Sequence, residues 1–190
     1  MAVKVYVATS LDGFIAGPNG ELDWLMEIPN PEQSDHGFAD FMAGIDAIVV
    51  GRNTFQSLLT FDAWSYHMPV FVLSNTLDEV PETLRGKAEI VSGDPESVVD
   101  QLAKRGRTNL YIDGGRVIQS FLERDLIDEM IITRVPVLLG DGIPLFGRTK
   151  QRLEFKTWRT EELGQGLVKS CYARARPPGA SSPPSHRDGG

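Results

Sequence analysis

Apolar residues along the chain alternate between short runs rich in β-branched side chains and stretches with helical spacing. Runs of the first kind are typical of buried strands, whereas apolar residues three and four positions apart predict the inner face of a helix. Strands are predicted at residues 3–10, 46–50, 69–73, 88–91, 109–113 and 130–138. Helices are predicted at residues 37–42, from Phe55, from the capping residue Asp94 to about Lys104, and after Arg116.

Two further runs, at residues 153–158 and 167–173, predict closing antiparallel strands. The alternation of strand and helix before them predicts a largely parallel sheet with helices on both faces. In sheets of this kind, ligands bind outside the carboxyl ends of the strands. Polar or glycine-containing segments follow four predicted strand ends, at Ser10, Val50, Leu73 and Asp113, and we expect these segments to converge on one binding edge.

The strand at residues 46–50 passes through Gly51 into Arg52, Asn53 and Thr54, where the next helix begins. A helix N-terminus has free backbone N–H groups and partial positive charge, which makes it a natural site for phosphate. Arg52 adds a permanent cation, and the next two side chains add hydrogen-bonding groups. This turn is predicted to hold a phosphate of a nucleotide cofactor. The alternative is a tight turn with a surface arginine.

The same order of strand, glycine, arginine and helix recurs after residues 109–113. Gly114 and Gly115 have no Cβ, so their backbone can approach a pyrophosphate group, and the next helix offers its N-terminus. A plain connector is the alternative for this segment alone, but two such turns at one edge favour two phosphate sites. Ser74 and Asn75, after another strand, are candidates for contacts with an adenosine ribose or its phosphate, and a solvated loop is the alternative.

Asp12 lies in the loop after the first strand. It is either a turn residue that hydrogen-bonds nearby backbone or an anchor for the polar edge of a substrate. The loop that contains Gly140 and Gly142 is either a hairpin connection or one wall of the substrate site. The histidine and cysteine positions show no metal-ligand spacing, and no Gly-x-Ser-x-Gly nucleophile motif is present.

Composition narrows the possible partners. A chain of 190 residues with 41% hydrophobic residues suits one globular domain, predicted at residues 1–175. The net charge of −7 argues against a nucleic-acid-binding surface. With Cys171 as the only cysteine, no intrachain disulfide can form. Neither a signal peptide nor a segment of transmembrane length is evident, so we expect a cytoplasmic protein with no membrane partner. Residues 176–190, rich in Pro, Ser and Gly, are expected to be a disordered tail.

Four motifs in this order resemble the dihydrofolate reductase-like superfamily, and most closely its branch of riboflavin-biosynthesis reductases, the RibD C-terminal type. They are Val-Ala-Thr-Ser-Leu-Asp-Gly-Phe-Ile-Ala at 7–16, Val-Gly-Arg-Asn-Thr-Phe at 50–55, Ile-Asp-Gly-Gly at 112–115 and Leu-Leu-Gly-Asp-Gly-Ile-Pro-Leu-Phe at 138–146. The resemblance covers residues 3–175. It implies an α/β fold, a three-layer α/β/α sandwich whose mostly parallel mixed sheet has about eight strands and an antiparallel C-terminal edge. It also implies NADPH as the hydride donor, a small-molecule substrate and a homodimer.

Carried over residue by residue, the resemblance also implies site residues. The nicotinamide ring would lie between the loop after Ser10 and the Gly-Gly turn, and Asp12 would face the substrate and assist proton delivery as the candidate catalytic residue. The implied cofactor-binding residues are Ala8, Gly51, Arg52, Asn53, Thr54, Ser74, Asn75, Gly114, Gly115, Arg116 and Val117. The implied substrate-binding residues are Asp12, Asp35, Gly140 and Gly142, and no metal site is implied.

The sequence departs from the family pattern in three places. The zinc deaminase half that often accompanies the riboflavin reductase is not expected, because one cysteine cannot supply its ligands. Asn75 stands where dihydrofolate reductases often have a basic residue, so a preference for NADPH over NADH depends mainly on Arg52. The helix carboxylate that holds the pterin in dihydrofolate reductases corresponds to Asp35 or Asp40, and both stay open.

The expected function is that of an NADPH-dependent reductase that transfers a hydride to a small pyrimidine- or pterin-like heterocycle. The resemblance implies an activity similar to that of 5-amino-6-(5-phosphoribosylamino)uracil reductase. The alternatives are a non-catalytic nucleotide-binding or sensor protein on the same fold and a dihydrofolate reductase-type activity. A polar group at Asp12 beside an open pocket favours the enzyme, whereas a filled pocket favours the sensor.

Overall fold

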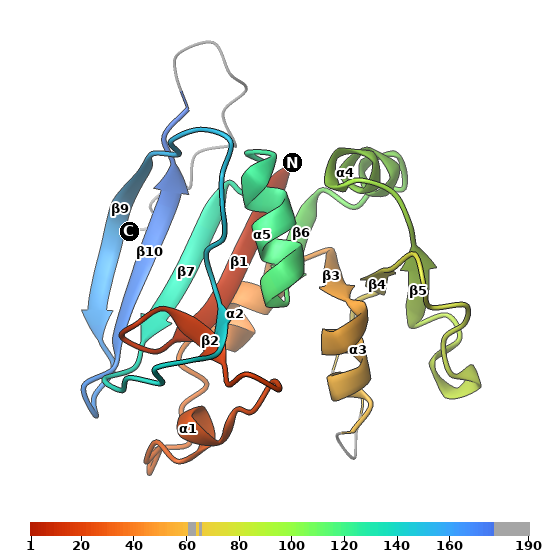
Figure 1. The fold of residues 1–190 in the computed structure, drawn as a ribbon. Helices are drawn as coiled ribbons and strands as arrows, with labels where there is room; N and C mark the ends of the chain where they lie inside the picture. Colours follow the sequence, from red (N-terminus) through yellow and green to blue (C-terminus); the bar gives the residue numbers. More distant parts are fainter. Residues whose placement is uncertain (61–63, 65, 177–190) are drawn as a thin grey trace.

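Strands and helices alternate along the chain and build one eight-stranded sheet with helices packed against it, as Figure 1 shows. The computed structural model describes residues 1–60, 64 and 66–176. The strands of this sheet are β1 (Ala2–Thr9), β3 (Ala47–Gly51), β4 (Val70–Leu73), β5 (Ala88–Val91), β6 (Asn109–Asp113), β7 (Glu129–Arg134), β9 (Phe155–Glu162) and β10 (Val168–Arg174). The predicted α/β fold with a mixed sheet is confirmed.

The order of the strands is β5-β4-β3-β6-β1-β7-β10-β9. The strands from β5 to β7 in this order pair in parallel, whereas β10 is antiparallel to β7 and β9 is antiparallel to β10. The predicted antiparallel C-terminal edge is therefore confirmed. Because parallel strands end at the same edge of a sheet, the carboxyl ends of β4, β3, β6 and β1 lie side by side.

Helices cover both faces of the sheet. They are α1 (Asp23–Met26), α2 (Phe38–Ala43), α3 (Arg52–Leu58), α4 (Pro95–Lys104) and α5 (Gly115–Glu123), with a 3₁₀ turn, η1 (Glu82–Leu84). The predicted start of α4 is confirmed, because the Asp94 side chain accepts the Ser97 N–H at 2.8 Å. Pro95 follows at a position where the helix needs no N–H donor.

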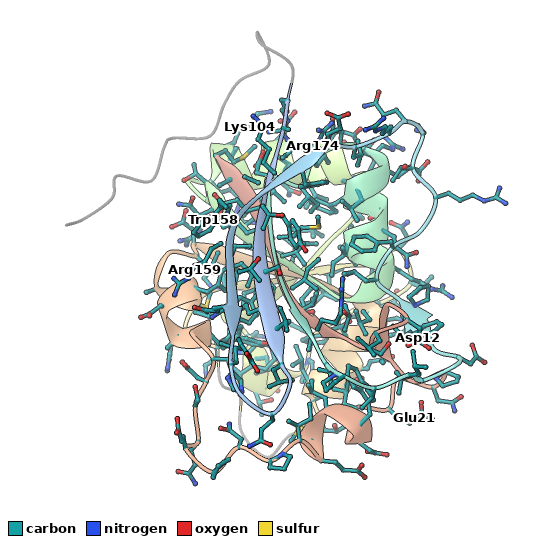
Figure 2. All side chains as sticks on the ribbon, turned by 90° about the vertical axis from the view of Figure 1, so that its left-hand side faces the viewer. Asp12, Glu21, Lys104, Trp158, Arg159 and Arg174 are labelled. Atoms are coloured by element: carbon teal, nitrogen blue, oxygen red, sulfur yellow. The ribbon has the colours of Figure 1, made fainter. Side chains whose placement is uncertain are left out.

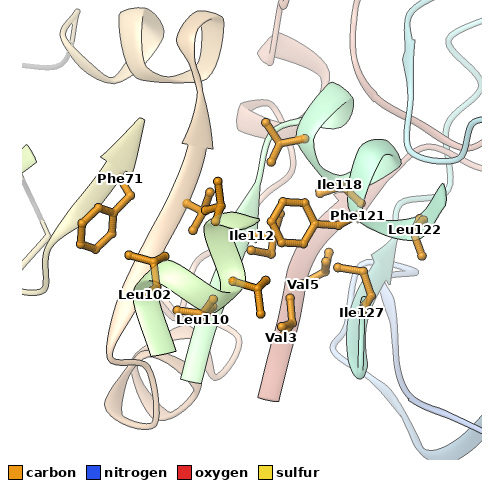
Figure 3. Packing of buried hydrophobic residues seen from close by; sticks show 14 of the residues in the cluster. Val3, Val5, Phe71, Leu102, Leu110, Ile112, Ile118, Phe121, Leu122 and Ile127 are labelled. Atoms are coloured by element: carbon orange, nitrogen blue, oxygen red, sulfur yellow. The ribbon is translucent and has the colours of Figure 1, made fainter. Parts of the chain in front are cut away.

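Two hydrophobic clusters lie on opposite faces of the sheet. The larger cluster fills the layer between the sheet and helices α4 and α5. Figure 3 labels ten of its members: Val3, Val5, Phe71, Leu102, Leu110, Ile112, Ile118, Phe121, Leu122 and Ile127. The smaller cluster includes Ile48, Val50 and Phe55, with Phe38 and Phe41 of α2 packed against it. Full burial of one such side chain contributes about 1.5–3 kcal/mol, so the two clusters hold the three layers together.

The strand predicted at residues 130–138 is wrong in length, because β7 ends at Arg134. Pro136 has no backbone N–H and cannot continue the ladder. The Val137 N–H turns back to the Val135 carbonyl at 2.8 Å, and the Val137 carbonyl accepts the Leu11 N–H at 2.8 Å. The chain therefore leaves the sheet here and crosses toward the loop that follows β1.

A separate two-stranded ribbon forms beside the sheet from β2 (Phe14–Ala16) and β8 (Ile143–Pro144). The sequence pattern predicts a loop at both places, because so few residues cannot show a strand period. β9 also continues to Glu162, beyond the predicted end at residue 158.

Near the end of the described chain, two arginines pair with carboxylates. Arg174 Nε lies 2.6 Å from Asp125 Oδ1, and Arg176 pairs with Asp128. Asp128 also accepts the Val3 N–H at 2.8 Å, which ties this end of the chain to β1. Of the tail predicted at residues 176–190, positions 177–190 lie outside the described residues. The described helices include none with the length and apolar character that a membrane span needs.

Candidate functional site

The four predicted strand ends share one edge of the sheet. Gly51 at the end of β3 lies beside Leu73 of β4, and Val50 lies beside Asp113 of β6. β1 is the next strand after β6 and ends at Thr9. The predicted convergence of these segments on one edge is confirmed.

The N-termini of α3 and α5 touch at this edge. Gly114 has a φ of 94°, a conformation that favours glycine, and a Cβ there would collide with the Thr54 hydroxyl. A Cβ on Gly51 would lie 3.0 Å from Val117 Cγ2. The free backbone N–H groups of both helix starts are thereby brought together, which is the arrangement that two linked phosphates require.

Positive charge at the start of α3 is not neutralised within the described chain. Gly51 and Gly114 occupy the N-cap positions, so neither helix start has a side-chain cap. Arg52 is exposed, and its Nη1 donates to the neutral Thr76 hydroxyl at 2.9 Å. No described carboxylate forms a salt bridge with Arg52. A guanidinium beside two uncapped helix N-termini suits an anionic ligand, so the donor set fits a dinucleotide.

Ser74 forms the turn that follows β4. Its Oγ accepts the N–H groups of Thr76 at 3.2 Å and Leu77 at 3.0 Å, while Asn75 is exposed. This turn presents Thr76 to Arg52, so the loop after β4 borders the start of α3. The sequence pattern does not single out Thr76, because only its position in space distinguishes it from other surface threonines.

The Asp12 carboxylate is held by three donors within the protein. It accepts Ser10 Oγ–H at 2.6 Å, the Leu139 N–H at 3.2 Å and the Gly140 N–H at 2.8 Å. These hydrogen bonds, the one from Ser10 most strongly, lower the pKa of Asp12. Figure 2 places Asp12 at the end of the molecule opposite to Arg174. The structure thus shows Asp12 joining two loops, and its predicted contact with a substrate stays a prediction.

The ribbon of β2 and β8 packs against the start of α5. A Cβ on Gly115 would lie 2.8 Å from Ile143 Cγ2 and 3.1 Å from Ile15 Cδ1. A Cβ on Gly142 would collide with the Ala16 carbonyl oxygen. The space beside these two glycines is therefore filled by protein, so contacts between Gly115 and a pyrophosphate would have to use the backbone N–H.

Asp113, which the sequence pattern does not select as a site residue, ends β6 directly before Gly114. Burial raises the pKa of its carboxyl, although the Gly114 N–H donates to Oδ1 at 2.8 Å and opposes the shift. The alternation of β6 turns Asp113 to the same face as Tyr111, which belongs to the cluster under α2 and α3. A carboxylate that ends an otherwise apolar strand is the signal that could have identified it. A buried acid with a raised pKa at a strand end is a candidate functional group.

An aromatic wall adjoins Asp113. Burial, and after it the negative charge of Asp113, raises the pKa of Tyr66 to about 12. Tyr66 packs edge-on against Trp64 at 5.7 Å between ring centroids, and Trp64 packs against Phe55 at 6.2 Å. The Trp64 Nε1–H is buried and has no hydrogen-bond partner among the described residues. A buried donor with no partner among the described residues is uncommon in a folded protein, which makes this aromatic cluster a candidate ligand contact.

Asp35 and Asp40 lie just before and within the first turn of α2, the helix that packs against this same face of the sheet. The Asp35 carboxylate accepts the Gly37 N–H at 2.9 Å and the Ala39 N–H at 2.8 Å, which lowers its pKa. Asp40 is exposed on the first turn of α2. Asp35 therefore supports the start of α2, and its contact with a substrate stays a prediction. Within the described residues, no cluster of three or more His, Cys, Asp or Glu side chains could hold a metal ion.

Comparison with known families and proteins gives consistent matches. The family model described as the RibD C-terminal domain matches residues 2–169. Uncharacterized protein YwjB of Bacillus subtilis is 31% identical over 177 residues, which cover 90% of this chain and 97% of YwjB. The crystal structure of a putative riboflavin biosynthesis protein from Shewanella sp. PV-4 has a TM-score of 0.89 and 48% identity, over 93% of this chain and 100% of that one.

A more distant structure shows the same fold. Dihydrofolate reductase from Enterococcus faecalis, complexed with NADP(H), has a TM-score of 0.63 and 13% identity, over 92% of this chain and 97% of the reductase. Identity this low demonstrates the fold alone. The predicted dihydrofolate reductase-like fold is confirmed.

Proposed function

The chain belongs to the RibD C-terminal domain family, and from this premise we propose that it is an NADPH-dependent reductase of a small, flat heterocycle. The substrate class is pyrimidine- or pterin-like, as for 5-amino-6-(5-phosphoribosylamino)uracil reductase. The observation that carries this proposal is the contact between two uncapped helix N-termini beside an arginine without a salt-bridge partner among the described residues.

In this proposal, the two helix starts divide the cofactor between them. The backbone N–H groups of residues 114–117 bind the pyrophosphate, and residues 51–54 bind the phosphate and adenosine side. Arg52, with the turn of Ser74 and Asn75, binds the phosphate that distinguishes NADPH from NADH. Ala8, on the face of β1 that Tyr6 shares, borders the nicotinamide. The bound cofactor supplies a hydride, and the protein supplies its orientation.

Asp113 and the aromatic wall bind the substrate in this proposal. The Asp113 carboxyl keeps its proton to a higher pH than an exposed aspartate does, because its surroundings disfavour the charged form. In its protonated form it can donate a hydrogen bond, or a proton, from its carboxyl oxygen to a ring nitrogen. The rings of Tyr66 and Trp64 offer stacking surface, and the Trp64 Nε1–H offers one donor. Asp12 keeps the loop after β1 in place.

Turnover tests this proposal. Purified protein is mixed with NADPH and a panel of pyrimidine, pterin and carbonyl compounds that includes dihydrofolate, and the loss of NADPH absorbance is followed. We expect NADPH oxidation with a pyrimidine, or with a pterin other than dihydrofolate, and a fall in kcat of at least about 100-fold in Asp113→Asn, with the NADPH affinity kept. Asp100→Asn, at an exposed aspartate of α4 on the other face of the sheet, is the matched control and should keep its kcat.

Three other outcomes would contradict parts of the proposal. Tight NADPH binding without oxidation by any compound would favour the sensor alternative, and turnover of dihydrofolate alone would favour a dihydrofolate reductase-type activity. Unchanged kcat in Asp113→Asn would remove Asp113 from the site. The homodimer is also proposed, and its mass in solution by light scattering tests it.

A further inference from the structure

A cavity of about 470 Å³ lies on the face of the sheet that carries α5. Met130 and Ile132 of β7, Tyr172 of β10 and Leu122 of α5 form much of its wall, and Leu153 and Phe155 close one side. Cavities that bind small ligands have volumes of about 300–1,000 Å³ and mainly apolar walls, so both its size and its lining suit a ligand.

One cation lies at this cavity. Among the described residues that line it, Arg134 is the only charged one, and none is Asp or Glu. It ends β7, and the alternation of the strand turns it to the same face as Met130 and Ile132. Arg134 is exposed and forms no side-chain hydrogen bond or salt bridge with any other described residue. A guanidinium at the rim of an apolar cavity complements a ligand with an apolar body and one anionic group.

The cavity lies on the opposite face of the sheet from Arg52 and Asp113, and it meets the proposed cofactor site only at the loop after β1, whose residues 9–11 and 13 belong to its lining. Arg52 follows β3, whereas Arg134 ends β7, and β6 and β1 lie between these two strands. Ala8 and Asp113 face the layer of α2 and α3, whereas Met130 belongs to the cluster under α4 and α5. A ligand in the cavity would therefore lie across the sheet from the nicotinamide and the substrate.

We propose that this cavity is a second binding site, for a small amphipathic anion with an aromatic or aliphatic body. The body packs against Met130, Ile132 and Tyr172, and a carboxylate, sulfonate or phosphate group pairs with Arg134. Burial of apolar surface favours binding, and the single cation selects an anion over its neutral analogue. This site does not depend on the proposed reductase activity.

Two fluorescent dyes with the same ring skeleton test the proposal. The anionic probe is 8-anilinonaphthalene-1-sulfonate, and its neutral counterpart without the sulfonate is N-phenyl-1-naphthylamine. We expect both dyes to bind the folded protein, and Arg134→Gln to weaken the sulfonate by about tenfold while the neutral dye changes less than about twofold. The matched control is Arg148→Gln, at an exposed arginine outside the lining, which should change neither affinity.

A variant that fills the cavity provides the second part of the dye-binding test. Leu153→Trp places a larger side chain at the half-buried wall and should weaken both dyes by at least about tenfold, while the melting temperature and circular dichroism stay close to those of the wild type. Should this variant not fold, Thr149→Trp at the exposed rim replaces it.

The proposal is overturned if the wild type binds neither dye. It is also overturned if Arg134→Gln and Arg148→Gln bind the sulfonate equally, or if the folded filling variant binds both dyes as the wild type does. Because no arm uses NADPH, failure here leaves the proposed reductase function unaffected.

Discussion

The turns that begin α3 and α5 share one sequence pattern, but the structure surrounds them differently. At the first turn, Gly51 has an ordinary φ of −81°, and the exposed Arg52 donates to a neutral hydroxyl and forms no salt bridge with any described residue. At the second turn, Gly114 has a φ of 94°, Gly115 is buried under the β2–β8 ribbon, and the preceding Asp113 has a raised pKa.

The difference shows how one local pattern can serve two tasks at one edge. The first turn supplies uncompensated positive charge, which a phosphate can use. The second turn supplies close packing and a carboxyl group whose pKa is raised by burial. If the two turns form a single site, changes at the second turn should act mainly on folding and chemistry, and changes at the first mainly on cofactor affinity.

The largest expected effect is on stability, in Gly114→Ala. The substitution forces alanine into a positive φ and against the Thr54 hydroxyl, so it should lower the free energy of unfolding by about 2–4 kcal/mol. Gly13→Ala is the matched control, since Gly13 has a φ of 86° and no neighbour within 4 Å of the added Cβ. Urea unfolding measures the free energy of unfolding of both variants. Gly13→Ala should lose only the part of this free energy that comes from forcing alanine into a positive φ. Equal decreases in the free energy of unfolding for Gly114→Ala and Gly51→Ala would show that the two turns do not differ in how tightly they are packed.

The next effect concerns the packing of the β2–β8 ribbon against Gly115. Gly115→Ala brings a Cβ within 2.8 Å of Ile143 Cγ2 and should lower the free energy of unfolding by about 1–3 kcal/mol. Ile143→Ala removes that methyl group, so the double variant should recover about 1 kcal/mol in a double-mutant cycle. Strictly additive losses would show that the ribbon does not press on the start of α5.

A smaller and pH-dependent effect is expected at Asp113. Its pKa is raised in the folded state, so its contribution to stability falls as pH rises from the unfolded-state pKa, about 3.9, to the folded value, and stays low above it. Asp113→Asn has no carboxyl group to ionise, so the variant does not lose this stability as pH rises. The free energy of unfolding of the variant, relative to the wild type, should therefore increase with pH across that window and then level off. A difference that does not change with pH would contradict the raised pKa.

The smallest effect is expected in Asp12→Ala, at an exposed loop contact. Its folded pKa is lowered, so its contribution is present above the unfolded pKa of about 3.9 and is lost as pH falls through the folded value. At neutral pH the Leu139 and Gly140 amides lose their acceptor and should exchange with deuterium faster, with little change elsewhere. Unchanged exchange at both amides would show that Asp12 does not anchor this loop.

Local sequence patterns predict the parts of this molecule that depend on neighbouring residues. The strands and the start of α4 follow from apolar runs and from the cap at Asp94. The edge where the turns before α3 and α5 meet follows from the parallel order of the strands. The roles of Asp12 and Gly115 depend on Gly140 and Ile143, which lie far along the chain, so no local pattern shows them. The raised pKa of Asp113 depends on burial by several elements at once, which sequence alone does not give.

Titration with NADPH and NADH tests the proposal that both turns form one dinucleotide site. Protein fluorescence is followed for the wild type, Arg52→Ala and the control Arg148→Ala. We predict that Arg52→Ala weakens NADPH binding by about tenfold and NADH binding by less, since the extra phosphate is the group that Arg52 pairs with, while the control binds as the wild type does. Absence of binding by either nucleotide at millimolar concentration, or equal NADPH affinity in both variants, would contradict the proposal.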